Sequence, residues 1–258
     1  MTKPATLVAA LCLLAPASAG AGGSVGAALS ASPSRIGLDG SARQAVRLTN
    51  PGSVAVDVVL SRGAFALDLR GRPHVSPSTA STDWLTVSPR HVRLAAGRTA
   101  SVTISSRVPK RAQPGDHPAL VLLTTRPTSA SGVAVLMRLG VVVTVRAPGV
   151  VVHRLALTGA RLRPKRRIVV HLANRGNVTE SLTPGRLSVT VERGGRVLQR
   201  LRVRRQDLLP HTRGIVELRP TRTIRGRCVV VVRLDGRLRR FAMPVSVGSS
   251  RTMGLRSH

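Results

Sequence analysis

Arginine residues at alternate positions are the part of this sequence best suited to bind a ligand. In an extended strand, residues two apart lie on one face, so each set would form a row of guanidinium groups. A guanidinium group binds a phosphate or a carboxylate through two parallel hydrogen bonds, and an anion would relieve the repulsion within a row. We therefore predict anion binding at Arg161, Arg163, Arg167, Arg200, Arg202, Arg204, Arg237 and Arg239.

A simpler interpretation of these rows stays open. Of the 41 basic residues, only Lys3, Lys110 and Lys165 are lysines, which is the composition that a GC-rich genome would favour. In that case the rows are solvated faces with no ligand.

Trp84 is the single tryptophan of the chain and a candidate for stacking on a sugar ring, as in a cell-wall-binding domain. Its neighbours Leu85 and Val87 continue an apolar alternation, which favours a role as an anchor in the core or in a turn. Both interpretations are kept.

Residues suited to catalysis or metal binding are scarce. The chain has three glutamates and scattered histidines, and it contains no nucleophile elbow, paired carboxylates, zinc-ligand spacing or phosphate loop. We interpret the adjacent Asp116 and His117 as residues of a turn. The sequence therefore predicts a protein that is not an enzyme, with no catalytic residues, metal or cofactor.

The elements that carry the arginines are predicted to be strands. Apolar residues alternate from Val133 to Val145, and shorter alternations follow Val54, Val102, Ile168 and Leu187. Proline or glycine interrupts the apolar runs at short intervals, and no helical periodicity extends over any length. This pattern is typical of an all-β sandwich.

An internal repeat divides the chain in two. The motif L-x-N-x-G-x-V occurs at residues 48–54 and again at residues 172–178, and its Asn and Gly suit a turn between strands. Leu94, Val102 and Ile104 match Leu208, Val216 and Leu218 in the same order. We therefore predict two tandem immunoglobulin-like β-sandwich domains, at residues 22–147 and 150–247.

The ends of the chain and its charge indicate export. Residues 1–21 have a basic start, an apolar stretch and a small-residue cleavage site, so we predict a cleaved signal peptide and an extracytoplasmic location, either secreted or associated with the cell envelope. The last residues, 248–258, are predicted to be a flexible tail, and no segment of the mature chain is apolar enough to span a membrane.

The net charge is +31, and residues 150–258 carry +20 of it. Nucleic acid is not expected as a specific partner, because the chain is exported and lacks the aromatic platforms of single-strand binders.

Short motifs in the first copy carry a resemblance to a known family. They are Asp83-Trp84-Leu85-Thr86-Val87-Ser88-Pro89, Val92-Arg93-Leu94 with Gly97, Val108-Pro109 and Pro114-Gly115-Asp116. These motifs resemble the N-terminal domain of WxL-interacting proteins, and the second copy is similar to the second domain of that family. The likeness covers about residues 25–247. Members usually continue into a membrane-spanning helix and a basic tail, which this chain lacks.

The resemblance implies an immunoglobulin-like domain that binds peptidoglycan, followed by a second domain that contacts other partners. Combined with the charge, it predicts a non-catalytic cell-envelope protein that binds peptidoglycan or another anionic wall polymer and contacts a surface protein.

Two alternatives remain. The domain pair also resembles periplasmic pilus chaperones, in which a long alternating strand, here Val133 to Val145, is donated to a secreted subunit. The chain could instead be a structural link within a surface complex.

Overall fold

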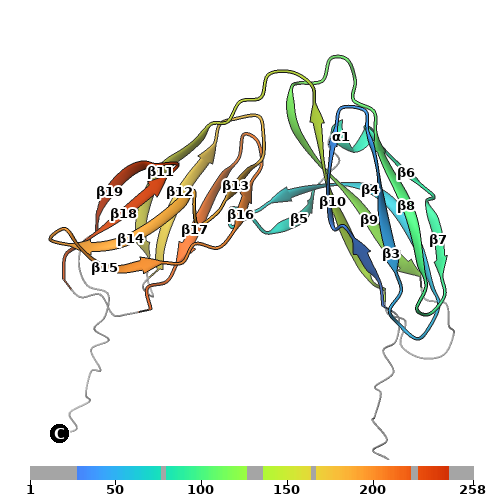
Figure 1. The fold of residues 1–258 in the computed structure, drawn as a ribbon, viewed down its shortest axis with the longest axis horizontal. Coiled ribbons are helices and arrows are strands. Elements are labelled where there is room, and N and C mark those ends of the chain that lie inside the picture. Colours follow the sequence, from blue (N-terminus) through green and yellow to red (C-terminus); the bar gives the residue numbers. More distant parts are fainter. Residues whose placement is uncertain (1–27, 77–79, 127–135, 164–166, 222–225, 244–258) are drawn as a thin grey trace, which may run out of the picture.

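Strands make up most of the part of the chain that can be described. The computed structural model describes residues 28–76, 80–126, 136–163, 167–221 and 226–243, so the predicted signal peptide (1–21) and tail (248–258) lie outside the described residues. The one helix within the described residues, α1 (Ala80–Asp83), has four residues. Figure 1 shows two β-sandwiches side by side, which confirms the predicted all-β fold of two immunoglobulin-like domains.

The first sandwich consists of two sheets. One has the strand order β1 (Ser30–Ser32), β3 (Arg43–Thr49), β8 (Thr99–Ser106), β6 (Leu85–Ser88). The other has the order β2 (Arg35–Asp39), β10 (Arg138–Ala147), β9 (Gly115–Arg126), β4 (Val56–Leu67), β5 (Pro73–Ser76), and β7 (His91–Leu94) also pairs with β4.

The second sandwich repeats this plan with fewer strands in its sheets. Its sheets are β11 (Leu155–Arg163), β12 (Arg167–Asn174), β17 (Arg213–Leu218), and β15 (Arg196–Leu201), β14 (Leu187–Arg193), β18 (Cys228–Leu234), β19 (Arg237–Met243). A short pair joins β13 (Glu180–Leu182) to β16 (Gln206–Leu208).

Each sandwich encloses its own hydrophobic core. Leu48, Ile104 and Val143 are fully buried in the first core, and Leu182 and Val232 are fully buried in the second. Each such side chain contributes about 1.5–3 kcal/mol when it leaves water. These alternating apolar residues hold the sheets face to face without any disulfide, since Cys228 is a free, buried thiol.

The alternating strand predicted at residues 133–145 is shorter at its start than expected. Val133 and Val135 lie outside the described residues, Leu136 and Met137 precede the strand, and β10 begins at Arg138. From Val141 to Val145 the predicted alternation is confirmed, because every second side chain is buried in the first core.

The predicted repeat is confirmed down to single hydrogen bonds. Asn50 Nδ2 donates to the carbonyl oxygens of Val54, Leu94 and Ala95, at 2.7, 3.1 and 3.2 Å, while Asn50 Oδ1 accepts from the backbone N–H of Gly52. The Asn50 amide therefore ties the β3–β4 turn to the end of β7. It supplies the hydrogen bonds that these backbone groups would otherwise need from water.

The second copy reproduces that arrangement. Asn174 Nδ2 donates to the carbonyls of Val178, Leu208 and Leu209, at 2.7, 3.2 and 3.1 Å, and Asn174 Oδ1 accepts from Gly176 N–H. The match of Leu94 with Leu208 in the sequence thus corresponds to one structural position.

The turn of the second copy also forms the joint between the domains. Asn177 donates to the carbonyls of Pro114 and Val150, and its own carbonyl accepts from Asp116 N–H at 2.8 Å. A side chain at Gly115 would overlap the carbonyl of Asn177, so this close approach requires glycine. Asp116 and His117, interpreted from the sequence as turn residues, instead lie at the start of β9.

A second joint lies at the tip of the β4–β5 hairpin. Figure 1 shows β5 extending from the first domain towards β16 and β17 of the second. The carbonyl of Leu69 accepts from Ile215 N–H at 2.6 Å, and Arg70 donates to Glu217 Oε1 at 2.9 Å. These two joints between the domains involve residues that are far apart in the sequence.

Among the described residues, no helix is both long and apolar enough to cross a membrane.

Candidate functional site

The outer edge of β10 is without a described partner strand at its start. β2 runs parallel to β10 and pairs with it only from Val142 to Arg146. Before Val142, from Arg138 to Val141, β10 pairs with β9 on its inner side, and no described strand pairs with its outer edge. An open edge of this kind is a template for another extended chain.

The direction of the free backbone groups follows from the pairing. Val142 N–H donates to Ser34 carbonyl at 2.9 Å, and the carbonyl of Arg146 accepts from Gly40 N–H at 2.8 Å. Backbone groups point alternately to the two edges of a strand, so those of Arg138 and Gly140 point to the same edge as those of Val142. These groups are therefore directed to the position that an added strand would occupy.

An apolar surface lies beside this edge. Leu122 is opposite Gly140 and Leu120 is opposite Val142, on the face of the sheet turned away from the first core. Phe65 and Leu120 are buried there against Leu209 of the second domain, while Leu122 and Val142 are only partly buried. Leu136, just before β10, is 59% exposed. An added strand would thus find apolar side chains next to hydrogen-bonding groups.

Charged residues fix the far end of β10. Arg146 Nε donates to Asp116 Oδ1 at 2.7 Å, and the other oxygen of Asp116 accepts from Thr179 N–H of the second domain at 2.8 Å. The hydrogen bond to buried Asp116 is the main reason that the pKa of Arg146 lies above its usual value. Arg35 of β2 likewise pairs with Asp207 of the second domain.

These paired carboxylates were missed from the sequence. Asp116 accepts hydrogen bonds from Arg146 and Thr179, which are 30 and 63 residues further along the chain. Nothing in the surrounding Pro-Gly-Asp-His-Pro sequence indicates these two contacts. The one usable signal was the repeat motif, because Gly176 and Asn177 belong to its second copy.

The predicted anion-binding arginines do not form one cluster. Arg161 and Arg163 are exposed on β11. Arg167 lies 3.7 Å from Glu217, which also accepts the hydrogen bond from Arg70. That hydrogen bond from Arg70 is the main cause of the lowered pKa of Glu217. Arg167 is therefore already beside a carboxylate of the same chain.

The remaining predicted arginines lie on the other sheet of the second domain. Arg200 and Arg202 line one depression on its outer face, and Arg204 is exposed beyond the end of β15. Arg237 and Arg239 are exposed on β19, the last strand of the sheet.

Trp84 is in contact with the protein itself. The indole packs against the first core and lies 4.6 Å from the ring of His117, centroid to centroid. His117 in turn is held by its Nε2 atom, 2.7 Å from the carbonyl of Gln113. Leu85 and Val87, which follow Trp84, are buried.

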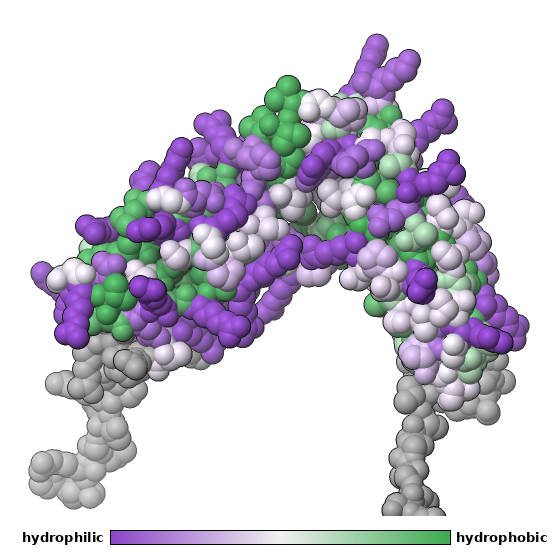
Figure 2. Space-filling view, in the orientation of Figure 1, coloured by the Kyte–Doolittle hydropathy of each residue, from purple (hydrophilic) through white to green (hydrophobic). Residues whose placement is uncertain are grey.

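A further apolar surface lies on the convex side, at the connection between the domains. Figure 2 shows it as a green patch among the purple hydrophilic residues. The valines at 150, 151 and 152 are 76%, 43% and 43% exposed.

No metal-binding group of three or more His, Cys, Asp or Glu side chains occurs among the described residues.

The comparisons with known proteins point to one class of structure. No protein-family model and no curated protein matches the sequence. Solved structures with a similar fold include the class 5 fimbriae chaperone CfaA, with 12% identity, coverage of 84% of this chain and 99% of that one, and a TM-score of 0.48. The E. coli chaperone DraB has 13% identity, coverage of 84% and 98%, and a TM-score of 0.44.

A third similar structure is the CsuC–CsuE chaperone–tip adhesion subunit complex of Acinetobacter baumannii, with 12% identity, coverage of 84% and 98%, and a TM-score of 0.46. Identities and scores this low transfer no function to the present chain.

The predicted membership of the WxL-interacting family is wrong. The similar structures are fimbrial chaperones, and no family model matches. The physical reason is that the motifs consist of core and turn residues: Leu85, Val87 and Leu94 are buried in the first core and would serve any such sandwich.

The predicted binding of peptidoglycan or an anionic wall polymer is wrong for the same reason, since it depended on that family. Wall binding at Trp84 loses its basis as well, because the indole packs on the core.

Proposed function

We propose that the chain is an extracytoplasmic, non-catalytic chaperone that binds an extended segment of an exported protein along the start of β10. The observation that carries the proposal is the half-covered edge, where no described strand pairs with the outer side of Arg138–Val141. Strand addition at such an edge gains affinity from backbone hydrogen bonds and specificity from side-chain contacts.

The neighbouring apolar face supports a client of this kind. Gly140 and Leu122 present little polar surface beside the edge, so the client would place apolar side chains there. A pilus subunit is a candidate client of this kind, because two of the similar structures are complexes of a chaperone with a tip adhesion subunit and with a pilin.

Several predictions from the sequence remain part of this proposal. We keep the signal peptide at residues 1–21, the domain bounds 22–147 and 150–247, and export from the cytoplasm. An exported client requires an exported partner.

A pair of substitutions at one position tests the edge. Arg138→Pro removes the N–H that points to the free edge and leaves the bonds of Leu139 to β9 in place, whereas Arg138→Ala removes only an exposed side chain. The chain is co-expressed with each exported protein encoded beside it, and copurification of the partner is measured.

We expect the natural chain and Arg138→Ala to retain one such partner and Arg138→Pro to lose it, with equal thermal unfolding midpoints. Deletion of the gene that encodes this chain should make the partner aggregate in the cell. If Arg138→Pro retains the partner as well as Arg138→Ala does, or no exported neighbour copurifies, strand addition at β10 is wrong.

A further inference from the structure

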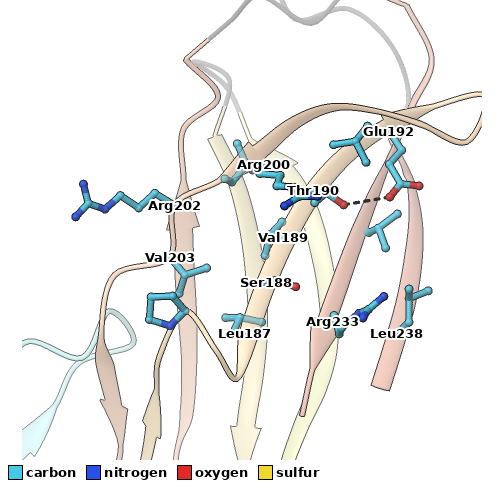
Figure 3. A pocket seen from close by; sticks show the side chains of 14 residues that line it. Leu187, Ser188, Val189, Thr190, Glu192, Arg200, Arg202, Val203, Arg233 and Leu238 are labelled. Carbon is cyan, nitrogen blue, oxygen red and sulfur yellow. Dashed lines mark hydrogen bonds between the residues drawn. The ribbon is translucent and has the colours of Figure 1, made fainter. Parts of the chain in front are cut away.

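A shallow depression on the second domain provides a separate surface, away from the edge of β10. It lies on the outer face of the sheet β15–β14–β18–β19 (Figure 3). Thr190 pairs with Arg200 on one side and with Val231 on the other, and Ser188 lies opposite Arg233. The depression therefore crosses several strands of one sheet.

The floor of this depression is apolar. Val231 does not belong to the second core, yet it is only 5% exposed, because neighbouring side chains of the outer face cover it. Val197 and Leu238 line the same depression and are each 43% exposed. Exposed valine and leucine beside a covered valine form a surface on which another apolar side chain can pack.

The rim of the depression is cationic. Arg200, Arg202 and Arg233 line it, and Figure 3 shows the Arg202 side chain extending outward from the depression. Its one acidic residue is Glu192, which accepts a hydrogen bond from Thr190 Oγ1 at 3.2 Å. Within the described residues, none of the three arginines forms an ion pair.

The second domain has too few carboxylates to neutralise these three arginines. Its five acidic residues are Glu180, Glu192, Asp207, Glu217 and Asp235. All except Glu192 already form ion pairs elsewhere: Glu180 with His153 and Arg186, Asp207 with Arg35, Glu217 with Arg70 and Arg167, and Asp235 with Arg186. Glu192 can balance at most one of the three arginines, so further counter-charge for the rim has to come from outside the domain.

We propose that this depression binds an extended, acidic segment of a partner protein in which a carboxylate and an apolar side chain lie two residues apart. In a strand, residues two apart point to the same side, so such a segment would set an apolar side chain over Val231 and Leu238 and a carboxylate within reach of Arg200 or Arg233. The inference does not depend on the proposed function, because it concerns a different domain and a different kind of contact.

The test uses the full chain and two labelled peptides. In one, glutamate and valine lie two residues apart with serine between them, so that both face the same side of a strand, and in the other lysine replaces glutamate. We expect the acidic peptide to bind more tightly, and its binding to weaken as salt is added, because the contacts include exposed charges. Binding is measured by fluorescence anisotropy.

Variants separate the two parts of the surface. Arg200→Ala combined with Arg233→Ala should weaken binding by about tenfold or more, since each removes a charge-assisted hydrogen bond. Leu238→Ser should weaken it by about threefold to tenfold by removing the apolar contact. The matched control is Arg43→Ala with Arg47→Ala, two exposed arginines on β3 of the first domain, which should leave binding unchanged.

Two outcomes would overturn the proposal. One is equal weakening by the Arg43/Arg47 control, which would mean that net charge alone attracts the peptide. The other is binding that is insensitive to Leu238→Ser and is matched by single-stranded DNA of the same charge, which would show an unspecific polyanion surface. Thermal unfolding midpoints equal to that of the natural chain show that the variants are folded.

Discussion

The last strand of each sandwich occupies the same place in its sheet but has a different surface. The order β10–β9–β4–β5 in the first domain corresponds to β19–β18–β14–β15 in the second. Across the outer face, Val142 lies opposite Leu120 in the first domain, whereas Arg240 lies opposite Val231 in the second. One scaffold thus presents an apolar face in one copy and a basic face in the other.

This difference indicates that the copies divide the work of binding. The buried residues maintain the fold of each sandwich, so residues at strand edges and on outer faces can differ between the copies without changing the fold. β19 has arginines at 237, 239 and 240, and charged residues on an edge strand oppose pairing with another chain. β10 has only Arg138 at its open start. The edge of the first copy is therefore suited to the strand addition proposed above, whereas the arginines of β19 oppose it.

The largest effect is expected where the copies are alike. Asn50→Ala and Asn174→Ala each leave three carbonyls without the amide donor, and each should lower the free energy of unfolding by about 3 kcal/mol. Urea unfolding followed by amide proton signals of each domain measures the loss.

The same pair of variants also separates the copies. Asn50→Ala should destabilise mainly the first sandwich, whereas Asn174→Ala should also loosen the joint, because the same turn contains Asn177 and the Gly176 N–H group that Asn174 holds. Equal effects of the two variants on both domains would contradict this assignment of the joint.

The second prediction concerns an arginine introduced into the apolar outer face of the first domain. Leu122→Arg places a charge on the half-buried surface beside Gly140, and it should weaken binding of the client by about tenfold or more, because a strand added there would have to bury the guanidinium group. Thr190→Arg, on the outer face of the corresponding sheet in the second domain, is the control and should leave client binding unchanged. The measurement is the dissociation constant of the purified client complex.

The third prediction concerns removal of the arginines from the edge strand β19 of the second domain. Arg239→Val with Arg240→Val should cause concentration-dependent association of the chain, seen as a rising sedimentation coefficient. Arg47→Val is the matched control, since Arg47 lies where β3 is paired on both sides, with Ser32 of β1 and with Ser101 of β8. Association of the control to the same extent would show that loss of charge, and not edge pairing, is the cause.

The smallest effect concerns pH. Arg186 donates two hydrogen bonds of 2.8 Å to Asp235, and this pairing is the main reason that the pKa of Asp235 lies below its usual 3.8. Because the folded-state pKa is lower than the unfolded one, the pairing stabilises the fold above about pH 4, and that stabilisation is lost as the pH falls through the folded-state pKa.

Asp235→Asn should therefore flatten the fall in unfolding midpoint on acidification below about pH 4. Asp83→Asn, at an exposed position of α1, serves as the control. An acid profile of Asp235→Asn that matches the natural chain would contradict the role of this ion pair.

The sequence predicted the local features of the fold because they follow from short-range geometry. Alternation placed Leu201 and Val203 inside and Arg200 and Arg202 outside, and the structure has them so, although β15 ends at Leu201. The repeated Asn-x-Gly motif predicted equivalent turns, because buried Asn and nearby glycine serve the same hydrogen bonds in both copies.

Features that depend on distant residues could not be predicted in this way. The open edge of β10 exists because β2 leaves it at Arg35, and no pattern within residues 138–141 records where β2 ends. Asp116 is a joint residue only because Thr179 faces it from the other domain. The family resemblance was wrong because short runs of turn and core residues recur in unrelated sandwiches.

The hairpin tip at Leu69 has a consequence for the reach of the whole molecule. Its bond to Ile215 lies far along the domain boundary from the bonds of Asn177, so rotation about either contact would break the other. Two sandwiches braced in this way keep a constant separation between the β10 edge and the β14 face. A macromolecule that bound the β10 edge and the β14 face at once would therefore need two binding segments at that fixed separation.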